Sequence, residues 1–317
     1  MTDDAPRNPG TELQTDWFDT IRINTPAVER RAASLPARRS LKKEWQAAWL
    51  LNAVRCMDLT TLSGDDTEDR AARLCAKARQ PIAPDLLDAM GVSGLTTGAV
   101  CVYPTMVAAA KRALRGTDIP VASVATGFPA GLMPLNLRLA EIEYARDQGA
   151  DEIDIVITRA HVLKADWPAL YDELRAMRQA CGPARMKAIL ATGDLKSLEN
   201  VARASHVAMQ AGADWIKTST GKEGVNATLT VSLVMCRAIR DHHDRTGVAV
   251  GFKPAGGLKT AKDAIAWQVL MREELGRDWL RPARFRIGAS SLLGDLERQI
   301  SHHVTGRYAA AHRLTMA

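Results

Sequence analysis

The stretch DEIDIVITRAHVLKADWPALYDELRAMRQACGPARMKAILATG, residues 151–193, decides the fold that this chain of 317 residues should adopt. A short apolar run at 151–158 is followed by an amphipathic helical pattern at 169–182 and by a second apolar run at 186–193. A strand, a helix and a strand in succession indicate a β-α-β unit. In such a unit the helix crosses over one face of the sheet, so the two strands are parallel.

The same unit recurs along most of the chain. Helical patterns fill the gaps between eight strand candidates, which span 56–60, 98–104, 121–128, 151–158, 186–193, 214–220, 248–256 and 284–291. Eight β-then-α units over about 250 residues predict an α/β fold of the (β/α)8 TIM barrel type. An open, doubly wound sheet is the alternative, because counting strands in one sequence does not establish that the sheet closes.

The ends of the chain differ from this pattern. Residues 1–25 are polar and interrupted by proline and glycine, which predicts an extended or loosely docked arm, and a helical pattern follows from 26 to about 54. We therefore expect an N-terminal arm and helical extension over 1–50, the barrel over 51–300 and a C-terminal tail over 301–317.

Composition limits the function classes. The net charge is +6, but much of the basic excess lies in 30–43 and is expected to be a solvated helix surface. A nucleic-acid partner is therefore not expected, whereas a basic surface favours small anionic substrates. Five scattered cysteines, the lack of a long apolar run and a polar N-terminus predict a cytoplasmic protein with reduced thiols and no membrane partner.

Side-chain alternation along three strands sends ionisable groups toward one axis. Bulky apolar residues on alternate positions should face the helices, while Asp154, Lys217 and Lys253 fall on the inner face. All three lie in the middle or C-terminal half of their strands, and barrel active sites lie at that end. We expect them to converge below the mouth of the barrel. A purely structural cluster of buried ion pairs is the alternative.

Two lysines beside one carboxylate have a chemical use. The ammonium form of a buried lysine is disfavoured by desolvation and by a neighbouring cation, which lowers its pKa. The neutral amine can then attack a carbonyl group and form a Schiff base, and a nearby carboxylate can transfer protons. The set of Asp154, Lys217 and Lys253 therefore predicts an imine-forming lyase or aldolase.

Glycine-bearing segments follow the last strands, at 220–222, 253–260 and 287–296. Backbone N–H groups at helix N-termini bind anions, and barrels commonly hold phosphate in the loops after strands 7 and 8. The three segments together predict a phosphate site. Each segment alone would also fit a tight turn or a helix cap.

Two further positions have alternative interpretations. Asp58 and Thr60 end the first strand and could form hydrogen bonds with substrate hydroxyl groups at the mouth, and Cys101 could line the pocket or be a buried apolar thiol. No spacing typical of a metal site occurs, and no G-x-G-x-x-G pattern of a dinucleotide site. We predict no metal and no cofactor.

The motifs MDLTTLSGDDT, CVYP, GADEIDIVI, ILATGDL, GADWIKTSTGK, NAT, VGFKPAGGLKTAKDA and FRIGASSLL run in order from about 56 to 293. Together they resemble the deoxyribose-phosphate aldolases, a family of Schiff-base (class I) aldolases with a (β/α)8 fold. The segments on either side resemble the longer form of the family known from animals. The resemblance implies reversible cleavage of 2-deoxy-D-ribose 5-phosphate to acetaldehyde and D-glyceraldehyde 3-phosphate, in deoxyribose phosphate catabolism.

The resemblance also implies residue roles. Lys217 would form the Schiff base, Lys253 would tune it and relay protons, and Asp154 would transfer protons. The phosphate would bind at Gly221, Lys222, Gly256, Gly257, Gly288, Ser290 and Ser291. Two features depart from the family pattern. Ala191 stands where some members have glutamate, so no catalytic role is assigned there, and Tyr308 is the nearest tyrosine to the C-terminus, where other members end in a tyrosine that aids proton transfer.

The alternatives are another Schiff-base aldolase that acts on a different phosphorylated sugar, and a non-enzymatic scaffold that uses the basic N-terminal helix. We expect a homodimer or other homo-oligomer, because closed two-fold assemblies are the commonest.

Overall fold

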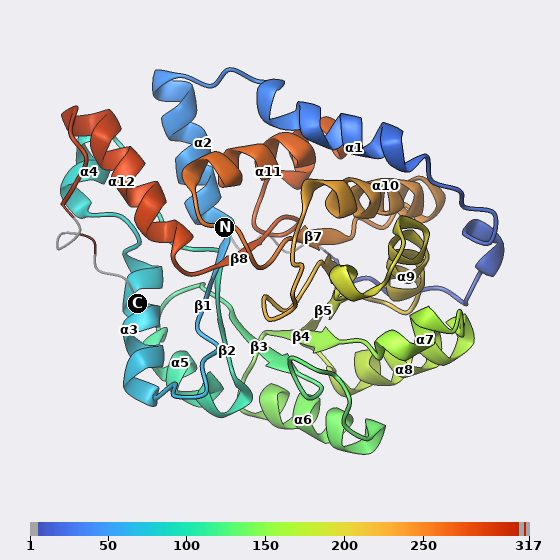
Figure 1. The fold of residues 1–317 in the computed structure, drawn as a ribbon. Coiled ribbons are helices and arrows are strands. Elements are labelled where there is room, and N and C mark those ends of the chain that lie inside the picture. The colour runs from blue at the N-terminus through green and yellow to red at the C-terminus, as the bar shows by residue number, and fades with distance from the viewer. Residues whose placement is uncertain (1–5, 311–313, 315–317) are drawn as a thin grey trace.

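The computed structural model describes residues 6–310 and 314. Eight parallel strands form one sheet in the order β7-β6-β5-β4-β3-β2-β1-β8. Figure 1 shows the strands at the centre with helices around them. The strands are β1 (Met57–Thr60), β2 (Ala99–Val102), β3 (Val121–Ala125), β4 (Glu152–Val156), β5 (Arg185–Ile189), β6 (Trp215–Lys217), β7 (Gly251–Lys253) and β8 (Ile287–Ala289). Seven of them lie within a predicted strand, and β5 begins one residue before the predicted strand 186–193.

The ends of this sheet meet. Parallel bridges pair Phe252 with Phe285 and Ala255 with Gly288, which joins β7 to the segment that contains β8. The sheet therefore closes into a barrel, so the (β/α)8 prediction is confirmed and an open sheet is excluded. The junction of β7 and β8 consists only of bridges in the described residues, whereas its neighbours form continuous ladders.

Helices alternate with the strands. Ser197, Thr228 and Thr260 cap three of them through their side chains, which satisfies backbone N–H groups at the helix N-termini. The helices of the barrel are α3 (Glu68–Arg79), α4 (Pro84–Ala89), α5 (Val107–Ala113), α6 (Leu135–Asp147), α7 (Arg159–Leu163), α8 (Trp167–Ala180), α9 (Leu198–Gln210), α10 (Leu229–Thr246), α11 (Ala261–Glu274) and α12 (Leu292–Thr305). Short 3-10 helices are η3 (Pro104–Met106), η4 (Thr192–Asp194) and η5 (Arg277–Trp279).

The last helix differs from the predicted boundary. We expected the barrel to end at 300, but α12 continues to Thr305 and ends at Gly306, which has φ of +72°. Glycine adopts this left-handed conformation without strain, so it terminates the helix. Position 300 therefore lies inside α12.

The N-terminal extension comprises an arm, η1 (Thr15–Trp17), α1 (Thr25–Ser34), η2 (Leu35–Ala37) and α2 (Lys43–Arg55). Helix α1 packs against α10, and α2 packs against α11 and α12 (Figure 1). Most basic side chains of 30–43 are exposed, as predicted for a solvated surface, and Arg31 and Arg39 also form ion pairs with Glu274 and Glu273 of α11. None of the described helices is long and apolar enough to cross a membrane.

From residue 6 on, the arm is extended and firmly docked. The side-chain amide of Asn8, which is 6% exposed, donates hydrogen bonds to the carbonyl oxygens of Met209 (2.7 Å) and Ala213 (2.9 Å). Its backbone N–H donates to Asp214 at 2.9 Å. Further along, Phe18 is fully buried. For the described part of the arm, the alternative of loose docking is therefore wrong.

We expect Asn8→Ala to lower the free energy of unfolding by about 1–3 kcal/mol, because the carbonyl groups of Met209 and Ala213 each lose a buried hydrogen bond. Urea unfolding followed by circular dichroism measures this change. Asn136→Ala, at an exposed position of α6, is the control and should change it by less than about 0.5 kcal/mol. Equal stability of the two variants would show that the arm contributes little to stability.

Candidate active site

The structure brings together the three residues on the inner face of β4, β6 and β7. The Oδ2 atom of Asp154 accepts hydrogen bonds from Nζ of Lys217 and from Nζ of Lys253, each at 2.8 Å. The three side chains are 0%, 3% and 1% exposed, respectively. The strand register explains the meeting, because Lys217 pairs directly with Lys253. Paired residues on adjacent strands place their side chains on the same face at the same height.

Other charged residues join this group, and sequence reasoning missed their part in it. Lys187 of β5 lies 3.1 Å from Oδ1 of Asp154 and also binds Glu152. Arg286 donates to Asp58 (2.6 Å) and to Glu152 (2.9 Å). The buried network thus holds four cations and three carboxylates. Side-chain alternation also predicts inner positions for Lys187 and Arg286, because the residues directly before and after each of them lie in the outer apolar core.

The electrostatics distinguish the two predicted lysines. Burial lowers the pKa of the Lys217 amine below its ordinary value, and the nearby Lys253 adds to this, whereas Asp154 opposes it. Burial also acts to lower the pKa of Lys253, but Asp154 and Asp58 outweigh it, so this pKa is raised. Lys253 contacts two carboxylates and Lys217 contacts one. Lys217 is therefore the lysine poised to lose its proton.

Asp154 stays ionised. Burial would raise the pKa of its carboxyl group, but Lys187, Lys217 and Lys253 together hold that pKa well below its ordinary value. The three lysines around this carboxylate compensate its charge, so Asp154 is ionised without being an isolated buried charge.

Of the two residues predicted at the mouth, Asp58 lies deeper, whereas Thr60 is half-buried. Asp58 is fully buried, and its carboxylate oxygens bind Lys253 (2.5 Å) and Arg286. The Thr60 hydroxyl donates to the carbonyl oxygen of Asp58 at 2.8 Å. Asp58 therefore belongs to the ionic network. Its side chain lies on the inner face of β1 and points into the barrel, not toward the mouth. Cys101 is buried on the barrel interior beside Ala122 and Val124.

The three glycine-bearing loops form one continuous surface at the C-terminal end of the barrel. A Cβ atom placed on Gly221 would lie 3.8 Å from Cα of Gly256, and the N–H of Gly288 donates to the carbonyl oxygen of Pro254 at 2.9 Å. Gly221 and Gly256 have φ of +88° and +81°, which other residues rarely adopt. Exposed positions on this surface are Gly221, Lys222, Gly257, Ser290 and Ser291.

Sequence reasoning did not single out Glu223. Its carboxylate accepts hydrogen bonds from the N–H groups of Thr220 (3.0 Å) and Gly221 (3.2 Å) and from the Thr220 hydroxyl (2.7 Å). It thereby holds the loop after β6 in shape. The sequence does carry a signal for this contact, because Thr220 is followed three residues later by Glu223, the spacing at which the two side chains can bond each other's backbone.

Ala191 and Tyr308 are the two positions at which the sequence departs from the pattern of the family that it resembles. Ala191 is fully buried, with φ of +54°, directly before η4. Tyr308 follows α12 and stacks on His302, with 4.4 Å between ring centroids. Within the described part of the chain, no group of three metal-binding side chains is placed to hold a metal ion.

Comparison with known proteins identifies the family of this chain. The family model described as DeoC/LacD family aldolase matches residues 53–295. The chain belongs to this aldolase family. Curated relatives of the DeoC/LacD aldolase family named deoxyribose-phosphate aldolase include one from Bos taurus, 61% identical over 97% of this chain and 98% of its own. Another, from Homo sapiens, is 60% identical over 98% of this chain and 99% of its own.

Solved structures of more distant aldolases share the fold. A putative deoxyribose-phosphate aldolase from Toxoplasma gondii has a TM-score of 0.70 at 20% identity and covers 86% of this chain and all of its own. One from Coccidioides immitis has a TM-score of 0.63 at 24% identity, with coverage of 86% and 97%. The DeoC/LacD model begins at residue 53, so the arm, α1 and most of α2 lie outside it.

Proposed function

We propose that this chain is a deoxyribose-phosphate aldolase in which Lys217 forms a Schiff base with the aldehyde carbon of open-chain 2-deoxy-D-ribose 5-phosphate. The products are acetaldehyde and D-glyceraldehyde 3-phosphate. The observation that carries the proposal is the buried contact of Lys217 with Asp154, beside Lys253, in a family of aldolases. The names of the curated relatives support the substrate.

The reaction follows from these positions. Neutral Lys217 attacks the carbonyl carbon, and loss of water gives an iminium ion. Removal of the proton from the C3 hydroxyl group lets the C2–C3 bond break. The electron pair of that bond moves toward the iminium group and gives an enamine. D-glyceraldehyde 3-phosphate leaves. Protonation of the enamine carbon and addition of water then release acetaldehyde and restore the amine.

Asp154 and Lys253 are proposed to move the protons. Asp154 lies within hydrogen-bond distance of Lys217, so it can exchange a proton with the carbinolamine formed there. Lys253 stays charged, because its pKa is raised, and donates to the same oxygen of Asp154. A fixed cation at this position stabilises negative charge that develops during the reaction.

The phosphate group is proposed to bind at the surface formed by the three loops. Backbone N–H groups next to glycine and the start of α12 suit an anion there. Lys222 adds a positive charge at an exposed position. The residues proposed to bind are Gly221, Lys222, Gly256, Gly257, Gly288, Ser290 and Ser291.

Borohydride reduction in the presence of acetaldehyde tests the central assignment. The reduced adduct should be an ethyl group on Lys217, located by peptide mass spectrometry. An adduct on another residue, or no adduct, would contradict the proposal. A parallel assay of glyceraldehyde 3-phosphate release, with ketone donors for comparison in the reverse direction, separates this substrate from those of other Schiff-base aldolases.

We expect Lys222→Met to raise KM about tenfold and to leave kcat nearly unchanged, because the lost charge binds the phosphate remote from the reacting bond. Steady-state kinetics with 2-deoxy-D-ribose 5-phosphate measure this. Lys111→Met is the control, since Lys111 pairs with Asp151, which precedes β4 and lies at the opposite end of the barrel. Equal KM values for the two variants would remove Lys222 from the phosphate site.

Assembly and location complete the proposal. We infer a cytoplasmic homo-oligomer, a location that fits five cysteines that are all buried and free. A structural neighbour from Aeropyrum pernix, 22% identical with a TM-score of 0.61, is described as tetrameric. Light scattering coupled to size-exclusion chromatography measures the number of subunits, and a monomer would contradict the inference.

A further inference from the structure

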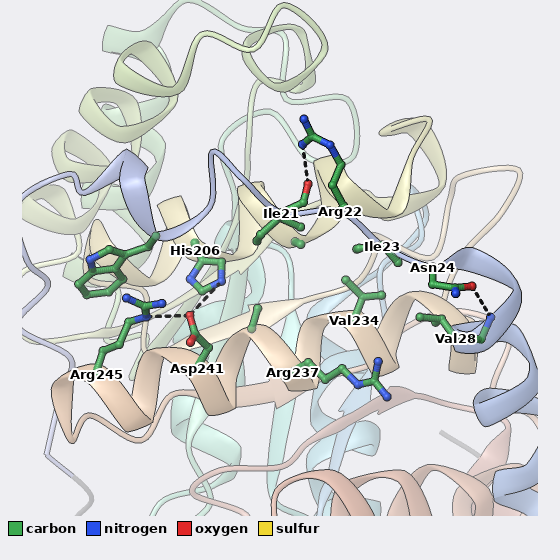
Figure 2. A pocket seen from close by; sticks show the side chains of 14 residues that line it. Ile21, Arg22, Ile23, Asn24, Val28, His206, Val234, Arg237, Asp241 and Arg245 are labelled. Carbon is green, nitrogen blue, oxygen red and sulfur yellow. Dashed lines mark hydrogen bonds and ion pairs between the residues drawn. The ribbon is translucent and has the colours of Figure 1, made fainter.

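A cavity of about 380 Å³ lies outside the barrel, between the N-terminal arm and helices α9 and α10 (Figure 2). We call it the arm cavity. Its apolar lining includes Trp17, Ile21, Ile23, Val28 and Val234. None of the proposed catalytic or phosphate-binding residues lines it. Small-molecule sites are typically concave and mostly apolar, with a few polar groups, and have a volume in this range.

Contacts within the protein hold the arm above the cavity, so the shape of the cavity does not depend on a ligand. The N–H of Ile23 donates to Glu199 of α9 at 3.1 Å, and the side chain of Asn24 caps α1. Phe18, next to the cavity residue Trp17, is fully buried. In Figure 2 the arm passes over α10, with Ile21 and Ile23 on one side of the gap and Val234 on the other.

The charges around the arm cavity are mainly positive. Arg22, Arg237 and Arg245 line it, with Asp241 as the acidic residue. Asp241 binds Arg245 at 2.9 Å.

The pairing of Arg237 is weak. Its partner carboxylate, Glu274, lies 3.6 Å away and also pairs with Arg31 and Arg240. Glu273 also pairs with Arg31, at 3.9 Å, but it binds a fourth guanidinium group as well, so two carboxylates face four guanidinium groups and leave positive charge uncompensated. Arg237, which is 44% exposed, can therefore receive an anion at the cavity rim.

A buried polar atom is also present. His206 lines the cavity and is 2% exposed, and its Nδ1 atom has no hydrogen-bond partner in the described structure. Burial lowers the pKa of His206 to about 4, so the ring is neutral at pH 7 and does not add charge. Native structures rarely leave a buried polar atom without a partner unless water or a ligand supplies one.

We propose that the arm cavity binds a small hydrophobic anion, with an apolar body between Ile21, Ile23 and Val234 and an acidic group at Arg237. The apolar lining suits the body, and the incompletely compensated positive charge of Arg237 suits a carboxylate or sulfonate group. The arm supplies one wall, and it lies outside the matched aldolase model. The site is therefore a property of the extended chain and is separate from the aldol reaction.

Titration of the full chain with 8-anilinonaphthalene-1-sulfonate, followed by its fluorescence, tests the proposal. This probe joins aromatic rings to one sulfonate group. We expect one saturable site per chain, unaffected by saturating 2-deoxy-D-ribose 5-phosphate. Displacement by that sugar phosphate would place the probe in the barrel and overturn the proposal, and so would a lack of saturable binding.

Two matched pairs of variants locate the site. Ala27→Trp fills the cavity from α1, while Ala33→Trp adds the same ring at an exposed position of that helix. We expect at least about a tenfold increase in Kd for the first and less than about twofold for the second. Circular dichroism checks that both variants fold. Equal Kd values for the pair would overturn the proposal.

The second pair tests the charge and does not depend on filling the cavity. Arg237→Gln should raise Kd about threefold to fivefold, whereas Arg240→Gln, which removes another partner of Glu274 from α10 outside the cavity, should not. Equal effects would mean general attraction to a basic surface and would overturn the proposal. Binding that weakens as the chain concentration rises would assign the cavity to a second copy of the chain instead.

Discussion

Lys217→Met should lower kcat for cleavage of 2-deoxy-D-ribose 5-phosphate by at least about 10³-fold, because methionine keeps the length of the side chain but cannot form an imine. The fold should persist. Asp154 keeps its contacts with Lys187 and Lys253, so no buried carboxylate loses its last partner. Release of glyceraldehyde 3-phosphate, followed in a coupled assay, measures the loss.

A second measurement makes the Lys217 result specific. Borohydride with acetaldehyde should leave no adduct on the Lys217→Met chain, while the unaltered chain is labelled. Labelling of the variant at the normal level would show that another amine forms the Schiff base, and Lys253 would be the first to consider because it lies against the same carboxylate oxygen.

Lys253→Met should lower kcat at pH 7 by about 10²-fold and move the acidic limb of the pH–rate profile to higher pH. The direction follows from the charges. Lys253 is a cation that lowers the pKa of Lys217, so its removal raises that pKa and reduces the neutral fraction at pH 7. Part of the lost rate should therefore return as the pH rises. Steady-state rates across pH 5–10 measure both effects.

Lys253→Arg is the matched control, since it keeps the positive charge and should keep the acidic limb near its normal position. The methionine variant leaves Asp58 bound to Arg286, which limits the structural effect of the change. An acidic limb that stays in place in Lys253→Met would show that Lys253 does not tune Lys217, even if the rate falls.

Local patterns were enough to predict the eight strands and the inner face of three of them. Side-chain direction in a strand alternates from residue to residue, so the direction of Asp154, Lys217 and Lys253 follows from their neighbours. The same alternation places Lys187 and Arg286 on the inner face, although it does not show which carboxylates they bind. Glu223 could not be placed in this way, because it lies in a loop where alternation does not apply.

The docking of the arm and the depth of Asp58 needed the structure. Polar residues and glycine before the first helix fit a loose arm as well as a docked one, and only the contacts of Asn8 distinguish the two. Asp58 was placed at the mouth because it ends a strand in the sequence. Its partner Arg286 lies 228 residues later in the chain, and the two meet in the buried network only because β8 pairs with β1.

The sequence by itself determined that parallel strands alternate with helices and that two lysines and an aspartate share the inner face, because both follow from periodicities of a few residues. Only the tertiary structure decided that the sheet closes, that Asp58 pairs with Lys253, and that Lys217 is the lysine whose pKa is lowered. A pKa depends on burial and on the distances between charges. Those distances are set by strands that lie far apart along the chain and meet only when the barrel forms.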